Sequence, residues 1–140
     1  MSTVSDAIAR FVIERAGERC EFCHMHQSLQ GATFHIEHII PRSRGGSNEV
    51  DNLAHACPSC NLSKSDRTQS IDPNSGTNVV FFNPRQHSWS DHFEWREADM
   101  VGRTDIGRAT VEALNLNQAR RKAIRAMERT FGLFPPQSLD

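Results

Sequence analysis

Apolar residues recur at helical spacing in three segments, and this periodicity predicts three helices. The first covers residues 5–16, where Ser5 can cap the N-terminus. The second covers residues 105–114 and begins after Thr104. The third, residues 116–131, is the clearest because one stripe along it is apolar: Leu116, Ala119, Ala123, Ile124, Met127 and Phe131. Its opposite face is polar and mostly basic, which predicts exposure to solvent: Arg121, Lys122, Arg125, Glu128 and Arg129.

Shorter runs of β-branched and aromatic residues predict strands. Residues 32–40 form the longest such run, and Pro41 ends it. Residues 53–56 predict a second short strand, and residues 58–65 predict a helix. Residues 79–82 begin the second half of the chain with another strand-like run. Strands and helices together predict a small α+β fold.

Length and composition exclude several classes of protein. The chain has 140 residues, of which 37% are hydrophobic, so its apolar core is thin and needs a staple. No run approaches the roughly 18 apolar residues of a membrane helix. The N-terminus lacks the basic start and apolar stretch of a signal peptide, which predicts a cytoplasmic protein with reduced cysteines. The formal net charge is −1, so nucleic-acid binding would require a local positive patch.

Four cysteines supply the candidate staple. They form two C-x-x-C pairs: Cys20 with Cys23, and Cys57 with Cys60. Two such pairs can complete a tetrahedral site for a structural zinc ion. Redox dithiols or four buried thiols are the alternatives, but a redox motif needs only one pair. His24 and His26 follow the first pair and could replace a thiolate as a ligand, although two loop histidines are the simpler interpretation.

The segment between the two pairs carries residues suited to phosphodiester hydrolysis. His38 offers a neutral imidazole, the usual general base near pH 7. Glu37 and Asn61 offer a carboxylate and an amide carbonyl, which are hard oxygen ligands for Mg²⁺ or Mn²⁺. Glu37 and His38 are adjacent, so in a strand they point to opposite faces. Glu37 would then bind the metal ion, and His38 would act on the water from another side. His35 is a further candidate ligand, although a surface position is favoured.

The pattern from the first C-x-x-C through IEHIIPRSRGGSNEVDNL to CPSCNLSK resembles the HNH endonucleases, in the form whose ββα-metal fold is stapled by a four-cysteine zinc site. The resemblance covers about residues 20–66. It implies that His38 is the general base and that Glu37 and Asn61 hold the catalytic cation. It also implies that Asn52 orients the loop and His38.

Several basic residues are candidate contacts to a phosphate backbone: Arg42, Arg44, Lys64, Arg121 and Arg125. The first two lie in a glycine-containing loop, and the last two lie on the basic face of the third helix. Lys64 follows Asn61 by three residues, so both can address one phosphate. A solvated surface is the alternative for the loop and the helix alike.

These observations predict two regions. Residues 1–70 would hold the N-terminal helix and the nuclease core, and residues 71–140 a mostly helical extension that packs on the core. Within the extension, residues 81–95 are dense in aromatic residues and histidine, which predicts a packing cluster over the zinc core.

The predicted function is a metal-dependent endonuclease that acts on DNA, with RNA as an open alternative and no membrane partner. It would use structural Zn²⁺ and catalytic Mg²⁺ or Mn²⁺. A non-catalytic, zinc-dependent nucleic-acid-binding module is the alternative from a different class. The sequence leaves the oligomeric state and the target open.

Overall fold

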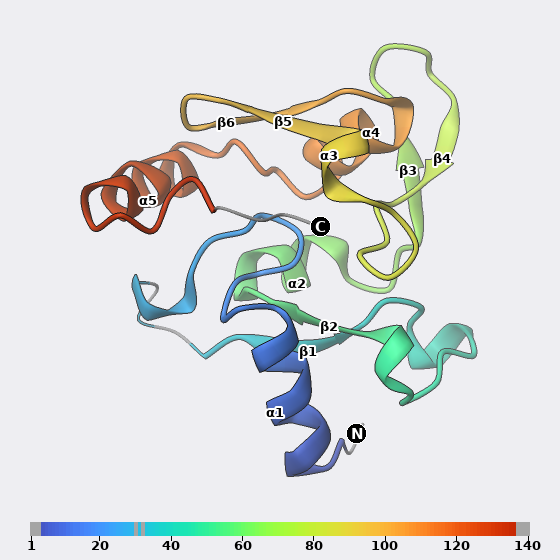
Figure 1. The fold of residues 1–140 in the computed structure, drawn as a ribbon. Coiled ribbons are helices and arrows are strands. Elements are labelled where there is room, and N and C mark those ends of the chain that lie inside the picture. The colour runs from blue at the N-terminus through green and yellow to red at the C-terminus, as the bar shows by residue number, and fades with distance from the viewer. Residues whose placement is uncertain (1–3, 30, 32, 137–140) are drawn as a thin grey trace.

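The segment between the two cysteine pairs folds as a hairpin followed by a helix (Figure 1). Strand β1 (His35–His38) pairs antiparallel with β2 (Leu53–Ala56), and helix α2 (Pro58–Lys64) follows at once. The predicted order of strand, strand and helix is therefore confirmed. The strand expected over residues 32–40 is shorter than predicted, and its first residue lies outside the described part of the chain.

The structure is a computed structural model that describes residues 4–29, 31 and 33–136. Helix α1 (Asp6–Arg15) precedes the first cysteine pair, and the Ser5 side chain caps it, as predicted, by accepting the N–H of Ile8. Helix α1 packs against β2. Short 3-10 helices complete the described part of this half: η1 (Gln27–Leu29), η2 (Arg42–Arg44) and η3 (Val50–Asn52).

Two further antiparallel hairpins belong to the second half of the chain. They are β3 (Gln69–Ile71) with β4 (Asn78–Val80), and β5 (Phe93–Arg96) with β6 (Asp99–Gly102). The sequence indicated a strand only near β4, so the other three strands are additions to the predicted picture. The division after residue 70 stays a prediction, and it would fall inside β3.

Three helices accompany these hairpins: α3 (Trp89–His92), α4 (Asp105–Ala113) and α5 (Ala119–Thr130). Thr104 caps α4, as predicted, by accepting the N–H of Gly107. Figure 1 shows the second-half elements gathered on one side, with α1 and the β1–β2 hairpin on the other. Within the described residues, no helix combines the length and apolar character needed to cross a bilayer.

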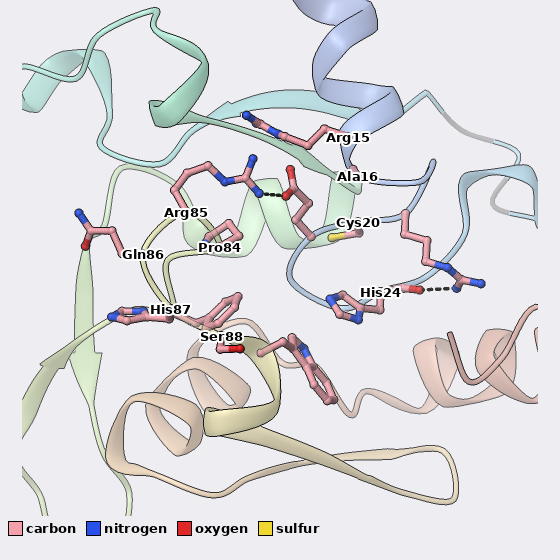
Figure 2. Close-up of a pocket in the computed structure, with 13 residues that line it drawn as sticks. Arg15, Ala16, Cys20, His24, Pro84, Arg85, Gln86, His87 and Ser88 are labelled. Atoms are coloured by element: carbon pink, nitrogen blue, oxygen red, sulfur yellow. Dashed lines mark hydrogen bonds and ion pairs between the residues drawn. The ribbon is translucent and has the colours of Figure 1, made fainter. Parts of the chain in front are cut away.

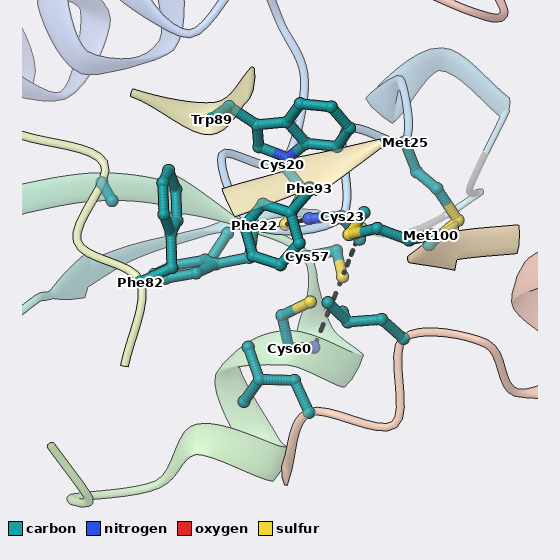
Figure 3. Close-up of a cluster of buried hydrophobic side chains, with 14 of the residues drawn as sticks. Cys20, Phe22, Cys23, Met25, Cys57, Cys60, Phe82, Trp89, Phe93 and Met100 are labelled. Carbon is teal, nitrogen blue, oxygen red and sulfur yellow. Dashed lines mark hydrogen bonds between the residues drawn. The ribbon is translucent and has the colours of Figure 1, made fainter. Parts of the chain in front are cut away.

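One cluster of buried side chains joins the two halves around the cysteines (Figure 3). Phe82, Trp89 and Phe93 from the second half pack with Phe22 and with all four cysteines. Burying a side chain of this size stabilises the fold by roughly 1.5–3 kcal/mol. The aromatic segment therefore packs over the cysteines, as the sequence predicted.

An ion pair with a buried carboxylate connects the β3–β4 hairpin to α4. The Nε and Nη2 atoms of Arg108 each donate to one carboxylate oxygen of Asp72, both at 2.9 Å. The Asp72 side chain has no exposed surface. The hydrogen bonds from Arg108 hold the pKa of Asp72 well below its usual range, so the carboxylate is charged at neutral pH.

Candidate functional site

The four cysteine sulfur atoms lie together, as the C-x-x-C spacing predicted. They all fall within 4.8 Å of one another, and the sulfur atoms of Cys23 and Cys57 are 3.7 Å apart. Four tetrahedral Zn–S bonds of about 2.3 Å would place the sulfur atoms about 3.8 Å apart. All four residues are buried, and none is in a disulfide. The cluster therefore fits a metal ion such as zinc.

Each pair is held by its own turn of chain. The Cys23 N–H points to Cys20 Sγ at 3.5 Å, and the Cys60 N–H points to Cys57 Sγ at 3.4 Å. Hydrogen bonds from the other three cysteines lower the pKa of Cys57, whereas burial raises the pKa of Cys20. Four thiolates in so small a buried space would repel one another, so the donor set suits a divalent cation that binds all four.

The two histidines next to the first pair have other partners. The His24 ring stacks on Trp89, with ring centroids 5.0 Å apart. The His26 Nδ1 atom lies 2.8 Å from Ser28 Oγ. Neither histidine belongs to the described metal-ligand group, which consists of the cysteines alone.

Glu37 is a buried carboxylate with one oxygen that lacks a hydrogen-bond partner. Its Oε1 lies 3.3 Å from Lys64 Nζ, while Oε2 is buried and has no hydrogen-bond partner in the part of the chain that the structure describes. Burial raises the pKa of Glu37, although the neighbouring Lys64 acts in the opposite direction. An unsatisfied buried polar atom costs about 1–3 kcal/mol. A bound cation would satisfy Oε2 and restore the charged form of the carboxylate.

His38 follows Glu37 in β1 and is oriented by a residue that the sequence analysis missed. Its Nε2 atom lies 2.7 Å from Asn48 Oδ1. The same amide oxygen accepts a hydrogen bond from Arg42 Nη1 at 3.0 Å, which fixes it as an acceptor. In a neutral ring that donates to this oxygen, Nε2 would carry the proton and Nδ1 the lone pair that a general base needs. A loop asparagine ten residues away gives no signal of this contact in the sequence.

The Asn52 side chain holds the loop after β1 closed through three hydrogen bonds to the loop backbone. Its Oδ1 accepts the N–H of Ile40 at 2.9 Å, and its Nδ2 donates to the carbonyl oxygens of Ile40 and Ser47 at 3.1 and 2.8 Å. Gly46 makes this closure possible, because a Cβ there would lie 1.6 Å from the Ile40 oxygen. The loop that Asn52 holds is the one that carries Asn48.

A hairpin and helix, four clustered cysteines and an adjacent Glu37–His38 pair are thus assembled in one segment. Residues 20–67 match the sequence model of the HNH endonuclease family. This confirms the predicted resemblance for that segment, which is referred to below as the HNH domain.

One curated relative also matches, more weakly. Septu protein PtuB of Bacillus thuringiensis is 24% identical over 109 residues, which make up 76% of this chain and 40% of that protein. The present chain therefore spans well under two thirds of the relative's length. No solved structure matches the chain.

Two candidate ligands of the HNH domain remain predictions in their roles. Asn61 is half-buried on α2, one turn before Lys64, whose ammonium group reaches Glu37. Helix α2 contacts β1, so Asn61 belongs to the helix that packs beside the Glu37 strand. His35 is exposed at the start of β1, two residues before Glu37 and therefore on the same face of the strand.

The structure corrects the prediction that Lys64, Arg121 and Arg125 contact nucleic acid. Their exposed fractions are 2%, 1% and 0%, so none of them reaches a phosphate outside the protein. Lys64 lies against Glu37 and the His38 carbonyl oxygen, while the two arginines face the interior from α5. Helical periodicity predicted that the two arginines face solvent, because it considers only the hydropathy of each side chain and not the buried partners that an arginine can contact.

Arg42 and Arg44 are exposed and stay predicted phosphate contacts. Arg44 borders a cavity of about 360 Å³, which also reaches Lys64. Its other walls are largely apolar and include Ile40 and Phe81. The HNH domain and the second half thus form the walls of this cavity together.

Figure 2 shows a second cavity, of about 410 Å³, lined by residues from α1, the first cysteine pair and residues 84–88. Its three arginines all have partners. Arg85 pairs with Glu21, Arg19 donates to the His24 carbonyl oxygen, and Arg15 donates to Leu53. Of these contacts, the Arg85–Glu21 pair joins the two halves of the chain.

Proposed function

We propose that this chain is a metal-dependent endonuclease that hydrolyses phosphodiester bonds in DNA. The proposal rests on the buried, unpartnered Oε2 of Glu37 next to His38, whose ring is held by Asn48. A carboxylate with a free lone pair and an oriented imidazole are the two groups that metal-assisted hydrolysis requires. The match of residues 20–67 to the HNH endonucleases supports the same reaction.

His38 acts as the general base in this proposal. Its Nδ1 lone pair accepts a proton from the attacking water, while Nε2–H stays hydrogen-bonded to Asn48. The amide oxygen of Asn48 then stabilises the imidazolium that forms. Asn52 holds the loop that carries Asn48, so it acts as a positioning residue.

Glu37 and Asn61 would hold the catalytic Mg²⁺ or Mn²⁺ in this proposal. When bound, such an ion neutralises charge on the phosphate and stabilises the leaving oxygen. Lys64 donates to Glu37 Oε1, which would leave Oε2 to bind the cation. Arg42 and Arg44 are exposed beside the site and would contact neighbouring phosphates.

We also propose that the ion in the cysteine cluster is structural Zn²⁺. Four buried thiols at tetrahedral spacing leave no open position for substrate, which is the mark of a structural site. Helix α2 carries Cys60 on one side and Asn61 at the next position, so the zinc would fix the helix that presents Asn61.

A supercoiled-plasmid assay tests the nuclease proposal. Zinc-saturated parent protein is incubated with Mg²⁺ or Mn²⁺, beside His38→Ala, a matched His26→Ala control, and the parent in EDTA. We expect the parent and His26→Ala to convert the plasmid, and His38→Ala to be at least about 100-fold slower. Nicked or linear product would report cleavage of one or both strands, and a labelled RNA duplex of matched sequence separates DNA from RNA.

Equal cleavage by the parent and His38→Ala would refute His38 as the general base. Binding of the DNA in a gel-shift assay, with no cleavage in either metal, would favour the non-catalytic nucleic-acid-binding module instead. Metal and zinc content measured on each variant ensures that a loss of cleavage reflects the substituted side chain.

A further inference from the structure

Helix α5 turns three charged side chains inward and leaves two large apolar ones exposed. Arg121, Arg125 and Glu128 are 1%, 0% and 0% exposed, while Met127 and Phe131 are 54% and 65% exposed. The apolar stripe predicts the opposite for these five side chains, although Ile124 of that stripe does pack against the core. Removing a charged group from water costs several kcal/mol unless a partner compensates for it. Each of the three buried charges therefore needs a partner inside the protein.

Two of the three charges have ordinary partners. Glu128 Oε2 accepts the His26 N–H at 2.9 Å, and its Oε1 lies 3.7 Å from Arg19 Nη1. Arg125 donates from Nη1 to the Ala98 carbonyl oxygen at 2.8 Å, and its guanidinium lies 5.2 Å from the centre of the Trp95 ring. Both groups therefore have hydrogen-bond or ion-pair partners outside the cysteine cluster, although Arg125 Nε and Glu128 Oε1 lack a hydrogen bond among the described residues.

Arg121 has a different environment. Its Nη1 donates to Cys60 Sγ at 3.3 Å, and among the described residues no carboxylate forms an ion pair with it. Its Nε is buried and has no hydrogen-bond partner among the described residues. Within that part of the chain, the cysteine cluster is the only counter-charge in contact with this guanidinium. Neutral thiols would not compensate for its burial, whereas thiolates would.

The charge of a filled cluster matches this requirement. Zn²⁺ with four thiolates carries a net charge of −2, because two positive charges meet four negative ones. Such an anion in a buried site needs cations and N–H donors around it. Residues that contact the ligands of a metal ion, rather than the ion itself, commonly supply such groups. Cys60 receives its donor from α5, which lies 61 residues further along the chain.

We propose that Arg121 is the counter-ion of the zinc tetrathiolate, so that the metal centre and α5 stabilise each other. The inference rests on zinc in the cluster and not on nuclease activity. Arg121 is a positioning residue here, because it acts on the metal through Cys60. Docking of α5 would then depend on the filled site, and zinc affinity would depend on docked α5 by the same factor.

Zinc competition against a chromophoric chelator tests this coupling on the full chain. Parent protein is compared with Arg121→Gln, Arg121→Lys and Arg120→Gln, the last being an exposed arginine on the same helix. We expect Arg121→Gln to weaken zinc binding by about 10–100-fold. We expect Arg121→Lys to fall between it and the parent, and Arg120→Gln to match the parent. The sulfur-to-metal absorption band of Co²⁺-loaded protein checks that all four thiolates still bind.

Limited trypsin digestion of the zinc-loaded proteins supplies a second readout. Cleavage after Arg125 requires release of α5, because that side chain is buried. We expect it to be faster in Arg121→Gln than in the parent. Cleavage after Arg125 is also measured in the parent protein, with and without a zinc chelator. This measurement tests the proposal even if Arg121→Gln fails to fold.

Parental zinc affinity and parental protection of α5 in Arg121→Gln would overturn the counter-ion role. In the chelator experiment, cleavage after Arg125 at an unchanged rate would also overturn it. A parent protein that holds no zinc would overturn the zinc assignment and this inference together. None of these outcomes depends on plasmid cleavage. The plasmid assay therefore tests the proposed nuclease activity independently of the counter-ion role.

Discussion

Replacing Asn52 by alanine tests how strongly one side chain holds the loop after β1. The change deletes the three hydrogen bonds to Ile40 and Ser47 and leaves their backbone groups without those partners. A typical hydrogen bond contributes about 1 kcal/mol net, so the loss should be about 3 kcal/mol. With a urea slope of about 2 kcal/mol per molar for a chain of this size, the unfolding midpoint should fall by about 1.5 M.

Urea unfolding followed by circular dichroism, at one fixed free zinc concentration, measures this change. Asn78→Ala is the matched control, since Asn78 is exposed and its side chain bonds only the Gln69 side chain among the described residues. It should shift stability by less than about 0.5 kcal/mol. Asn52→Ala should also cleave plasmid more slowly, because the loop carrying Asn48 would no longer hold His38. Equal midpoints for Asn52→Ala and Asn78→Ala would refute the role assigned to these hydrogen bonds.

Three other perturbations address particular contacts. Gly46→Ala should abolish the loop closure and reduce plasmid cleavage, because its Cβ would collide with the Ile40 oxygen; parental activity would contradict this. Burial raises the pKa of Glu37, and only the carboxylate binds metal, so Mn²⁺ affinity should begin to fall at a pH above the ordinary carboxyl value of 4.5. Titration calorimetry across pH checks this, and constant affinity down to that value would count against Glu37. Arg108 lowers the pKa of Asp72, so the ion pair stabilises the fold above the ordinary carboxyl pKa of 3.8, and this contribution is lost as the pH falls below that value. The melting temperature of Asp72→Asn should therefore lie below that of the parent at neutral pH and approach it in acid. A difference in melting temperature that does not change with pH would refute the ion pair's contribution.

The cysteine cluster and the strand–strand–helix order could be predicted because their signals are local. C-x-x-C spacing sets two ligands by covalent geometry, and the short β-branched runs and Pro58 mark element boundaries. Ser5 and Thr104 are caps whose effect depends only on neighbouring N–H groups.

The β5–β6 hairpin could not be predicted, because its turn lacks the usual glycine or asparagine. Glu97 adopts a left-handed conformation there, with φ of 56°, which sequence preferences assign to other residue types. The inverted α5 escaped for another reason. Its buried Arg121 donates to Cys60 Sγ, and a periodicity that ranks side chains by hydropathy contains no information about a sulfur atom 61 residues away in the chain.

The tryptophan pair at the edge of the cluster gives this protein an intrinsic optical signal. The chain has two tryptophans and no tyrosine, so Trp89 and Trp95 account for nearly all of its ultraviolet fluorescence. Their rings lie 5.1 Å apart, and Trp95 faces the Arg125 guanidinium of α5. Emission from unlabelled protein therefore reports selectively on the contact between α5 and the region around the cysteines, and it can follow assembly of that region in real time.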